Sequence, residues 1–264
     1  MKQIEKVDSG IAVRFNGKEK IFKNKPIFFP SKYKEVKEKF LEGNDVVVIG
    51  MNGYSSITTK DCKNWGIKEG AYEAACEAIL RNIIKYLWEV FPGVDIRVVH
   101  GASDMGVDKA IIRIAKELNI IQLGHSCPEY MMYVADDEIP VYVAGNKEAY
   151  ANSFVESLDI LIAANGRVHA FTHDIDATFK KSKYLLPVNV IRAISANGGA
   201  PAFGPNGEIE DAVSAFEQRV YMVSSQLGQK PISMWNELNI NITSVMENIV
   251  RNMISPQRAF GNFG

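Results

Sequence analysis

The segment VVHGASDMGVDKA, residues 98–110, carries the residue types best suited to ligand chemistry. Glycine lets a backbone approach a ligand closely, serine or aspartate caps a helix, and the free N–H groups at a helix N-terminus attract an anion. An apolar run ends at His100 and a helical pattern follows shortly after, which predicts a strand, a short loop and a helix. Two interpretations stay open for this loop: a cradle for a phosphorylated ligand, or a tight turn.

Three residues near the same strand ends have side chains that can act in catalysis. His100 titrates near neutral pH in the ordinary case and could act as a general base, although a histidine at a strand end often only satisfies backbone groups. Cys127 lies two residues from His125 and could act as a nucleophile. No third group that would orient this pair is evident, so a buried thiol is the alternative interpretation.

The stretch HAFTHD places His169 and His173 four residues apart, a spacing that can put two imidazoles on one helix face. No third metal ligand accompanies them, so no metal site is predicted. The favoured interpretation is that Thr172 caps a helix and His173 lies in its first turn. If a ligand binds nearby, Thr172 and His173 are placed to meet a second phosphate or a ribose hydroxyl.

The elements that position these residues follow from the apolar pattern. Short apolar runs at 45–50, 95–100, 120–124, 139–144, 159–164 and 188–195 predict strands buried on both faces. Helical patterns separate them, most clearly at 67–91 and 107–119, with another at 172–186. This alternation predicts an α/β fold, a Rossmann-like parallel sheet flanked by helices. Ligands bind beyond the carboxyl ends of such strands, where the glycine-containing loops are expected to meet.

The two ends of the chain add to this sheet. IAVRF and KEKIF flank Asn16-Gly17, which predicts a β-hairpin, and Ser31 is placed to cap a short helix. A glycine- and proline-rich loop at 195–208 precedes two further helical patterns. The expected organisation is an N-terminal hairpin and short helix in 1–44, a Rossmann-like domain in 45–225, and a C-terminal helix and tail in 226–264.

A long connection follows the first core strand, at 51–66, and long loops in compact domains are often lids or binding loops. Tyr54 or Trp65 in this segment could stack on a base. The alternative is that Trp65 packs against the edge of the sheet.

Composition limits the classes of function. The 264 residues contain 30 Lys and Arg and 31 Asp and Glu, a balance that makes a nucleic-acid partner unlikely on charge. Three cysteines without a CxxC pair favour a reducing compartment, and a cytoplasmic location is expected. No leader or membrane-spanning stretch is recognised, so no membrane partner is predicted.

The motifs VVVIGMNGYSS, VVHGASDMGVDKAIIRIAKELNI and SLDILIAANGR resemble the SLOG superfamily of Rossmann-like nucleotide-binding domains, which includes the DNA-processing protein DprA and the LOG phosphoribohydrolases. The resemblance covers roughly residues 45–195. It implies a nucleotide-based ligand held by three turns, whose matching residues are Gly50, Met51 and Asn52; Gly101, Ala102, Ser103, Gly106 and Asp108; and Asn165, Gly166 and Arg167.

The chain departs from this family pattern at two places. The turn from His100 to Asp108 is one residue longer than the usual form, and Asp104 stands where the family often has arginine or a neutral group. NGGAPAFGPNGEIED only superficially resembles the PGGxGTxxE motif of the LOG enzymes, so the catalytic glutamate of that motif is not carried over to Glu208 or Glu210.

These observations predict a protein that binds a nucleotide or an ADP-ribose-like signalling molecule, as a sensor or sequestering protein and as a homo-oligomer, without a cofactor. A nucleotide N-glycoside hydrolase or transferase is the alternative, for which Asp104, Asp108 and Glu129 are the acids to consider. An assembly protein with a vestigial pocket is a third interpretation.

Overall fold

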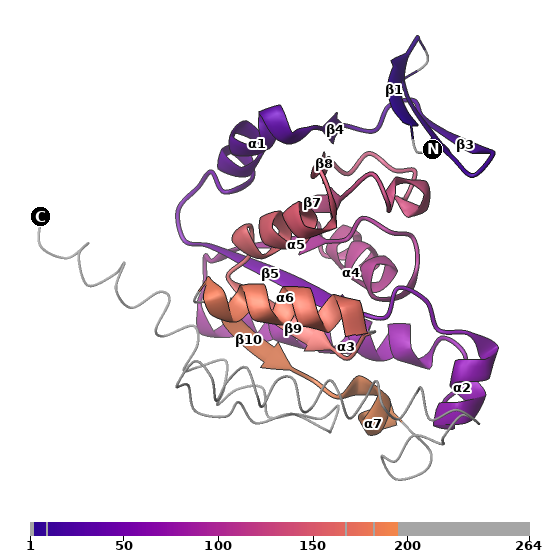
Figure 1. Ribbon diagram of the computed structural model, residues 1–264. Coiled ribbons are helices and arrows are strands. Elements are labelled where there is room, and N and C mark those ends of the chain that lie inside the picture. Colours follow the sequence, from indigo (N-terminus) through magenta and orange to yellow (C-terminus); the bar gives the residue numbers. More distant parts are fainter. Residues whose placement is uncertain (1–2, 9, 167, 182, 195–264) are drawn as a thin grey trace, which may run out of the picture.

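The computed structural model describes residues 3–8, 10–166, 168–181 and 183–194, and its main body is an α/β layer structure (Figure 1). Every pairing in the main sheet is parallel, and its strand order is β10-β9-β5-β6-β7-β8-β4. The predicted Rossmann-like parallel sheet is therefore confirmed. The strands are β4 (Ile27–Phe28), β5 (Val46–Gly53), β6 (Asp95–His100), β7 (Ile121–Ser126), β8 (Val141–Val143), β9 (Ile160–Ala164) and β10 (Tyr184–Pro187).

Helices cover both faces of this sheet. One face packs against α3 (Ala71–Val90), α4 (Gly106–Glu117) and α7 (Val190–Ile194). The other packs against α1 (Tyr33–Phe40), α5 (Lys147–Glu156) and α6 (Val168–Lys180). Successive residues of a strand point to opposite faces, so Val47 and Ile49 of β5 belong to the first core and Val48 to the second. Burial on both faces explains why the strands read as unbroken apolar runs.

A second, antiparallel sheet precedes the main one and consists of β1 (Gln3–Val7), β2 (Gly10–Phe15) and β3 (Lys18–Phe22). The predicted hairpin is confirmed: Asn16 and Gly17 have φ angles of 49° and 74°, as a type I′ turn requires. β1 is an addition that the sequence did not indicate. This sheet lies against the short 3₁₀ turn at Met131–Tyr133, where Val13 and Phe22 share a core with Met131.

The last predicted strand, 188–195, is wrong. β10 consists of Tyr184–Pro187, and residues 190–194 form α7 instead. Val190 and Ile191 are fully buried in this helix, and a short apolar run is equally compatible with a buried helix or a buried strand. Pro187 fits β10 because that strand is at the edge of the sheet, where a missing backbone donor is tolerated.

Three predicted boundaries also need correction. β5 continues to Gly53, so Gly50 lies inside the strand and not in the loop after it. α6 begins at Val168, so Thr172 is not its N-cap. Ser31 lies in a 3₁₀ turn, Pro30–Lys32, and α1 begins without a side-chain cap.

The connection after β5 contains a helix, α2 (Thr59–Trp65), where a long loop was predicted. Thr58 and Asp61 form a reciprocal capping box at its start, and Gly66 ends it with a φ of 64°. The signals for this helix were present in the sequence, although seven residues are too few to show a helical apolar period.

The predictions for the loop at 195–208, for the C-terminal helices and for the 226–264 unit fall outside the described residues. Among the described helices none has the length and apolar character needed to cross a membrane. Cys62, Cys76 and Cys127 are all buried free thiols.

Candidate functional site

The direction in which the chain crosses the sheet reverses beside β5. The chain runs from β5 outward through β6 and β7 to β8, then returns through α5 to β9 on the opposite side of β5. In open parallel sheets ligands bind in the crevice that such a reversal leaves at the carboxyl ends of the strands. The loops after β5, β6 and β9 therefore surround the candidate site.

Tyr72, from α3, closes one side of this crevice. Its hydroxyl accepts a hydrogen bond from the Tyr54 N–H at 2.9 Å and donates one to the Ala164 carbonyl at 2.7 Å, which ties the end of β5 to the end of β9. Gly53 makes this possible, because a Cβ at that position would lie 2.1 Å from the Tyr72 hydroxyl oxygen. Sequence reasoning missed Tyr72 as a positioning residue, since nothing in the sequence distinguishes it from an ordinary buried aromatic at the start of a long helix.

The loop after β6 is closed by its own hydrogen bonds. The Asp108 carboxylate accepts from the N–H groups of Gly101 at 2.7 Å and Ser103 at 3.4 Å. His100 Nδ1 accepts from the Ala102 N–H, and the Ser103 hydroxyl accepts from the Met105 N–H. These are the N–H groups that a phosphate cradle would use. A carboxylate of the chain already occupies their centre, so the geometry favours a tight turn over a cradle for a bare phosphate.

Gly106 has a packing role at the start of α4. Its φ is 52°, and a Cβ there would lie 2.1 Å from the Tyr54 carbonyl oxygen. The next residue, Val107, donates its N–H to the same carbonyl at 3.0 Å. Gly106 thus allows the loops after β5 and β6 to lie in direct backbone contact.

A buried polar cluster lies on the α5 and α6 side of the strand ends. Asn52, at the end of β5, donates from Nδ2 to an oxygen of Asp174 on α6 at 3.1 Å. Burial, together with the nearby Asp108 carboxylate, raises the pKa of Asp174 to about 7, although the hydrogen bond from Asn52 acts in the opposite direction. Burial raises the pKa of Asp108 to about 6, although its backbone donors favour the ionised form. The Tyr150 hydroxyl of α5 also approaches this cluster, since it would lie 3.0 Å from a Cβ on Gly101.

Asp174 and Tyr150 were not identified from the sequence as site residues. Ile175 and Thr178 of the same helix are buried with Asp174. A prediction that started this helix at Val168 would have placed Asp174 on the helix face toward the sheet. No sequence signal distinguishes Tyr150 from an ordinary core aromatic.

The other predicted contact residues lie partly in the core and partly in the loop after β9. Met51 is buried in the core, as is Gly50, where a Cβ would meet Leu158 at 2.6 Å. Asn165, with a φ of 62°, uses its side chain to hold the chain beyond β10: it donates to Asn189 at 3.0 Å and accepts from the Ile191 N–H at 2.9 Å. Gly166 follows directly, with a φ of 138°.

The remaining predictions concern the start of α6. Arg167 and the side chain of Thr172 fall outside the described part of the structure. His173 is exposed and lines a separate shallow groove between α5 and α6 with Lys180 and Lys181. The described residues contain no group of three or more His, Cys, Asp or Glu side chains that could hold a metal ion.

Burial makes the two histidines weak bases and keeps the cysteine protonated, which suits none of them to the catalytic roles considered from the sequence. Burial lowers the pKa of His100 to about 3 and that of His125 to about 3, so both rings are neutral at physiological pH. Burial raises the pKa of the Cys127 thiol to about 12. The structural interpretation of these three residues therefore holds. Tyr54 and Trp65 likewise pack together, with ring centroids 5.2 Å apart, and both are 2% exposed.

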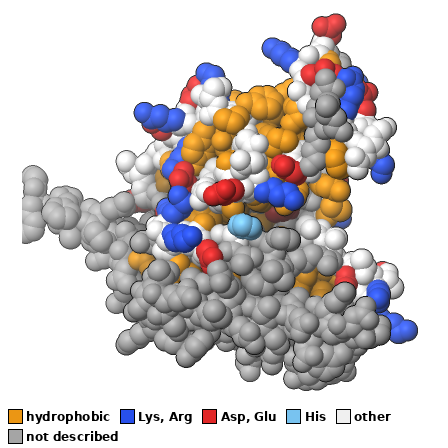
Figure 2. All heavy atoms as spheres, viewed as in Figure 1, with side chains coloured by type: hydrophobic (Ala, Val, Ile, Leu, Met, Phe, Trp, Pro, Cys, Tyr) orange, Lys and Arg blue, Asp and Glu red, His pale blue; other side chains and the backbone are white. Residues whose placement is uncertain are grey.

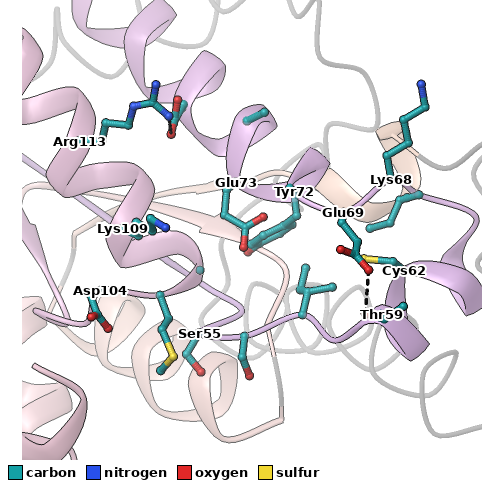
Figure 3. Close-up of a pocket in the computed structure, with 18 residues that line it drawn as sticks. Ser55, Thr59, Cys62, Lys68, Glu69, Tyr72, Glu73, Asp104, Lys109 and Arg113 are labelled. Atoms are coloured by element: carbon teal, nitrogen blue, oxygen red, sulfur yellow. Dashed lines mark hydrogen bonds and ion pairs between the residues drawn. The ribbon is translucent and has the colours of Figure 1, made fainter. Parts of the chain in front are cut away.

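An open pocket of about 560 Å³ lies between the 54–70 segment, the start of α3 and the start of α4 (Figure 3). Figure 3 shows Glu73 near its middle, with Lys109 and Arg113 of α4 on one side and Glu69 and Lys68 on the other. Ser55, Ser56 and Thr59 add hydroxyl groups to its lining.

Three of the charged groups in this pocket already have partners. Arg113 forms an ion pair with Glu77 at 3.3 Å, and Glu69 accepts from the Thr59 hydroxyl at 2.7 Å. Lys68 and Lys109 form no ion pair with any residue that the structure describes. The pocket therefore offers cations, hydroxyls and the Glu73 carboxylate to a ligand that has both acidic groups and hydrogen-bond donors.

The face that carries α5 and α6 shows no stripe of basic residues. In Figure 2 its positive and negative side chains are interspersed, and apolar side chains gather over the part near β4 and α1.

The chain matches no protein-family model and no curated protein sequence. Its fold is similar to that of solved structures at low identity, among them TM1055 and proteins that bind or carry the molybdenum cofactor. TM1055, a structural-genomics target, is 11% identical with a TM-score of 0.49, over 76% of this chain and 99% of that one. The molybdenum cofactor binding protein from Rippkaea orientalis is 14% identical with a TM-score of 0.46, over 79% and 99% of the two chains. The Moco carrier protein from Chlamydomonas reinhardtii is 14% identical with a TM-score of 0.48, over 78% and 98%.

Proposed function

We propose that this protein binds a nucleotide-derived small molecule, of the ADP-ribose kind, at the carboxyl edge of its parallel sheet, and that it acts as a sensor or sequestering protein. The observation that carries the proposal is the pocket of about 560 Å³ beside the loops after β5 and β6. Its size is within the range of about 300–1,000 Å³ in which proteins hold small molecules. The resemblance of the same loops to the SLOG superfamily supports a nucleotide-based ligand.

The lining of the pocket fits such a ligand group by group. Lys109 lies in the first turn of α4, where its charge adds to the positive end of the helix dipole, so an acidic group of the ligand is attracted to this corner. Glu73 can accept from the amino or hydroxyl groups of the ligand. Ile57, Ile67 and Met105 supply apolar surface for a base.

A second candidate function, cleavage of an N-glycosidic bond, is favoured by one observation. Asp174 has a pKa of about 7 and lies beside Asp108 at the strand ends, so a carboxylic acid is available near neutral pH. Among the acids weighed from the sequence, Asp108 belongs to this cluster and Asp104 lines the open pocket. Binding without turnover remains the first proposal, because His100, His125 and Cys127 are unsuited to catalysis.

The experiment is to incubate the full-length protein with adenine nucleotides, NAD, ADP-ribose and cyclic ADP-ribose, and to analyse the bound and free fractions by mass spectrometry. The molybdenum cofactor is included because two of the similar structures are named for it. Recovery of one unchanged nucleotide per chain supports a binding protein. Release of free base beyond one equivalent identifies the hydrolase, and retention of no nucleotide contradicts both.

Substitution locates the ligand. Lys109→Ala should weaken binding about ten-fold, which corresponds to the loss of one charge-assisted hydrogen bond. Lys85→Ala, on an exposed position of α3 outside the pocket, is the matched control and should bind as the wild type does. Equal affinity in the two variants would exclude the pocket as the binding site of the acidic group.

A homo-oligomer remains a prediction. Light scattering after size-exclusion chromatography of the full chain, with and without ADP-ribose, tests it.

A further inference from the structure

Asn52 has an amide oxygen that is buried and unpaired. The residue is 6% exposed, its Nδ2 donates to Asp174, and its Oδ1 has no hydrogen-bond partner among the described residues. Rotating the amide by half a turn would only exchange the two atoms, so one polar atom stays unsatisfied in either orientation. A buried unpaired polar group costs stability, and its presence at a strand end suggests a partner from outside the chain.

Tyr150 brings a second unused polar group to the same place. Its hydroxyl forms no hydrogen bond with a residue that the structure describes, while its ring is held by Tyr130, at 5.7 Å between centroids, and by Phe154, at 6.3 Å. Gly101 leaves room for this hydroxyl beside Asp108: a Cβ at Gly101 would lie 2.6 Å from a carboxylate oxygen of Asp108 and 3.0 Å from the Tyr150 hydroxyl. The hydroxyl is therefore fixed in place without a partner for it.

The cluster combines acceptors with donors. The Asn52 oxygen and the carboxylates accept, the Tyr150 hydroxyl both donates and accepts, and burial keeps a proton on Asp174 near neutral pH, which makes it a donor as well. A cationic ligand would need acceptors only. Both Asp108 oxygens also already accept backbone N–H groups. A mixed set of this kind matches hydroxyl groups, which donate and accept at once.

We propose that Asn52, Asp108, Asp174 and Tyr150 form a subsite for a neutral group that carries adjacent hydroxyls, the chemistry of a pentose ring. The proposal rests on the proposed function in one respect: the pentose would be that of the nucleotide-derived ligand. It adds that the sugar is recognised on the α5 and α6 side of the strand ends, apart from the acid-binding corner at Lys109.

The test uses D-ribose, which has neither phosphate nor base, as the probe. Saturation-transfer NMR with the full-length protein measures its binding to the wild type and to Asn52→Ala. Tyr150→Phe keeps the ring and removes only the hydroxyl, so it reports on the subsite even if Asn52→Ala does not fold. The matched controls are Asn152→Ala and Tyr133→Phe, both at exposed positions.

The expected result is binding of D-ribose to the wild type and both controls, and about ten-fold weaker binding to Tyr150→Phe and to Asn52→Ala where it folds. 2-Deoxy-D-ribose, with one hydroxyl fewer, should bind more weakly than D-ribose. Absence of D-ribose binding to the wild type, or equal binding to Tyr150→Phe, would overturn the subsite.

Failure of the subsite and failure of the proposed function give different results. Suppose that ADP-ribose binds, that Lys109→Ala weakens its binding, and that Tyr150→Phe leaves the affinity for D-ribose unchanged. Only the subsite is then wrong. If D-ribose binds as expected and no nucleotide does, the subsite stands and the proposed function is wrong.

Discussion

Replacement of Asp174 by asparagine should stabilise the protein above neutral pH. The side-chain amide that Asp174→Asn introduces can still accept the hydrogen bond from Asn52, and the substitution removes a carboxyl group that ionises only at a cost in the folded chain. The folded-state pKa of Asp174 is raised to about 7 from an ordinary value of 3.8. Ionisation therefore favours the unfolded chain, and the stability that the protonated acid allows is lost as the pH rises from about 4 to about 7.

The magnitude follows from the size of this shift. A difference of about three pKa units, at about 1.4 kcal/mol per unit, amounts to roughly 4 kcal/mol once both states are fully ionised. The expected gain for Asp174→Asn is thus about 4 kcal/mol at pH 8, about 2 kcal/mol at pH 5.5, and close to zero at pH 4. A typical domain is stable by about 5–15 kcal/mol, so the effect would be a large fraction of the total stability.

Urea unfolding followed by circular dichroism at a series of pH values measures this gain. Asp136→Asn makes the same carboxyl-to-amide change at an exposed position and is the matched control. A stability difference between Asp174→Asn and the wild type that stays constant from pH 4 to pH 8 would refute the reasoning, because it would mean that Asp174 does not titrate as a buried acid. A residue that costs this much stability is most simply accounted for by a function.

Two further substitutions test the arrangement of the strand ends. Tyr72→Phe should lower the free energy of unfolding by roughly 2–3 kcal/mol in urea titrations, because a backbone N–H and a carbonyl lose their partner. Tyr133→Phe is the control at an exposed position. Equal stability of the two variants would show that the Tyr72 hydroxyl does not tie β5 to β9. His125 has a folded pKa of about 3, lowered by burial, against about 6.5 in the unfolded chain, so protonation favours unfolding and stability falls as the pH drops below about 6.5. His125→Gln should flatten this fall between pH 7 and pH 5, and an unchanged slope would contradict the assignment.

The sequence predicted the sheet well because its strands are buried on both faces. Runs such as 45–50 and 159–164 are apolar after their first residue, and their alternation with helical patterns is typical of a parallel α/β sheet and of few other folds. The same property caused the error at 188–195, where Val190 and Ile191 are buried in a helix. Periodicity cannot separate strand from helix in so short a run, and Pro187 was not recognised as the end of an edge strand.

The site was only partly predictable. The carboxyl edge and its three loops follow from the strand order expected of this fold, and Asn52, Gly101 and Asp108 do lie there. Which way Asp108 points could not be read from the sequence, because a carboxylate in the first turn of a helix can face a ligand or its own loop. Tyr72, Tyr150 and Asp174 come from helices, and their direction depends on helix starts that sequence patterns place only to within several residues.

The most direct test of the central claim is a crystal structure of the full chain with bound ADP-ribose. We predict that the diphosphate lies near Lys109 and the start of α4, and that a ribose hydroxyl lies within hydrogen-bond distance of the Asn52 amide. A nucleotide bound away from the carboxyl edge of the sheet, or crystals that take up none, would contradict the account.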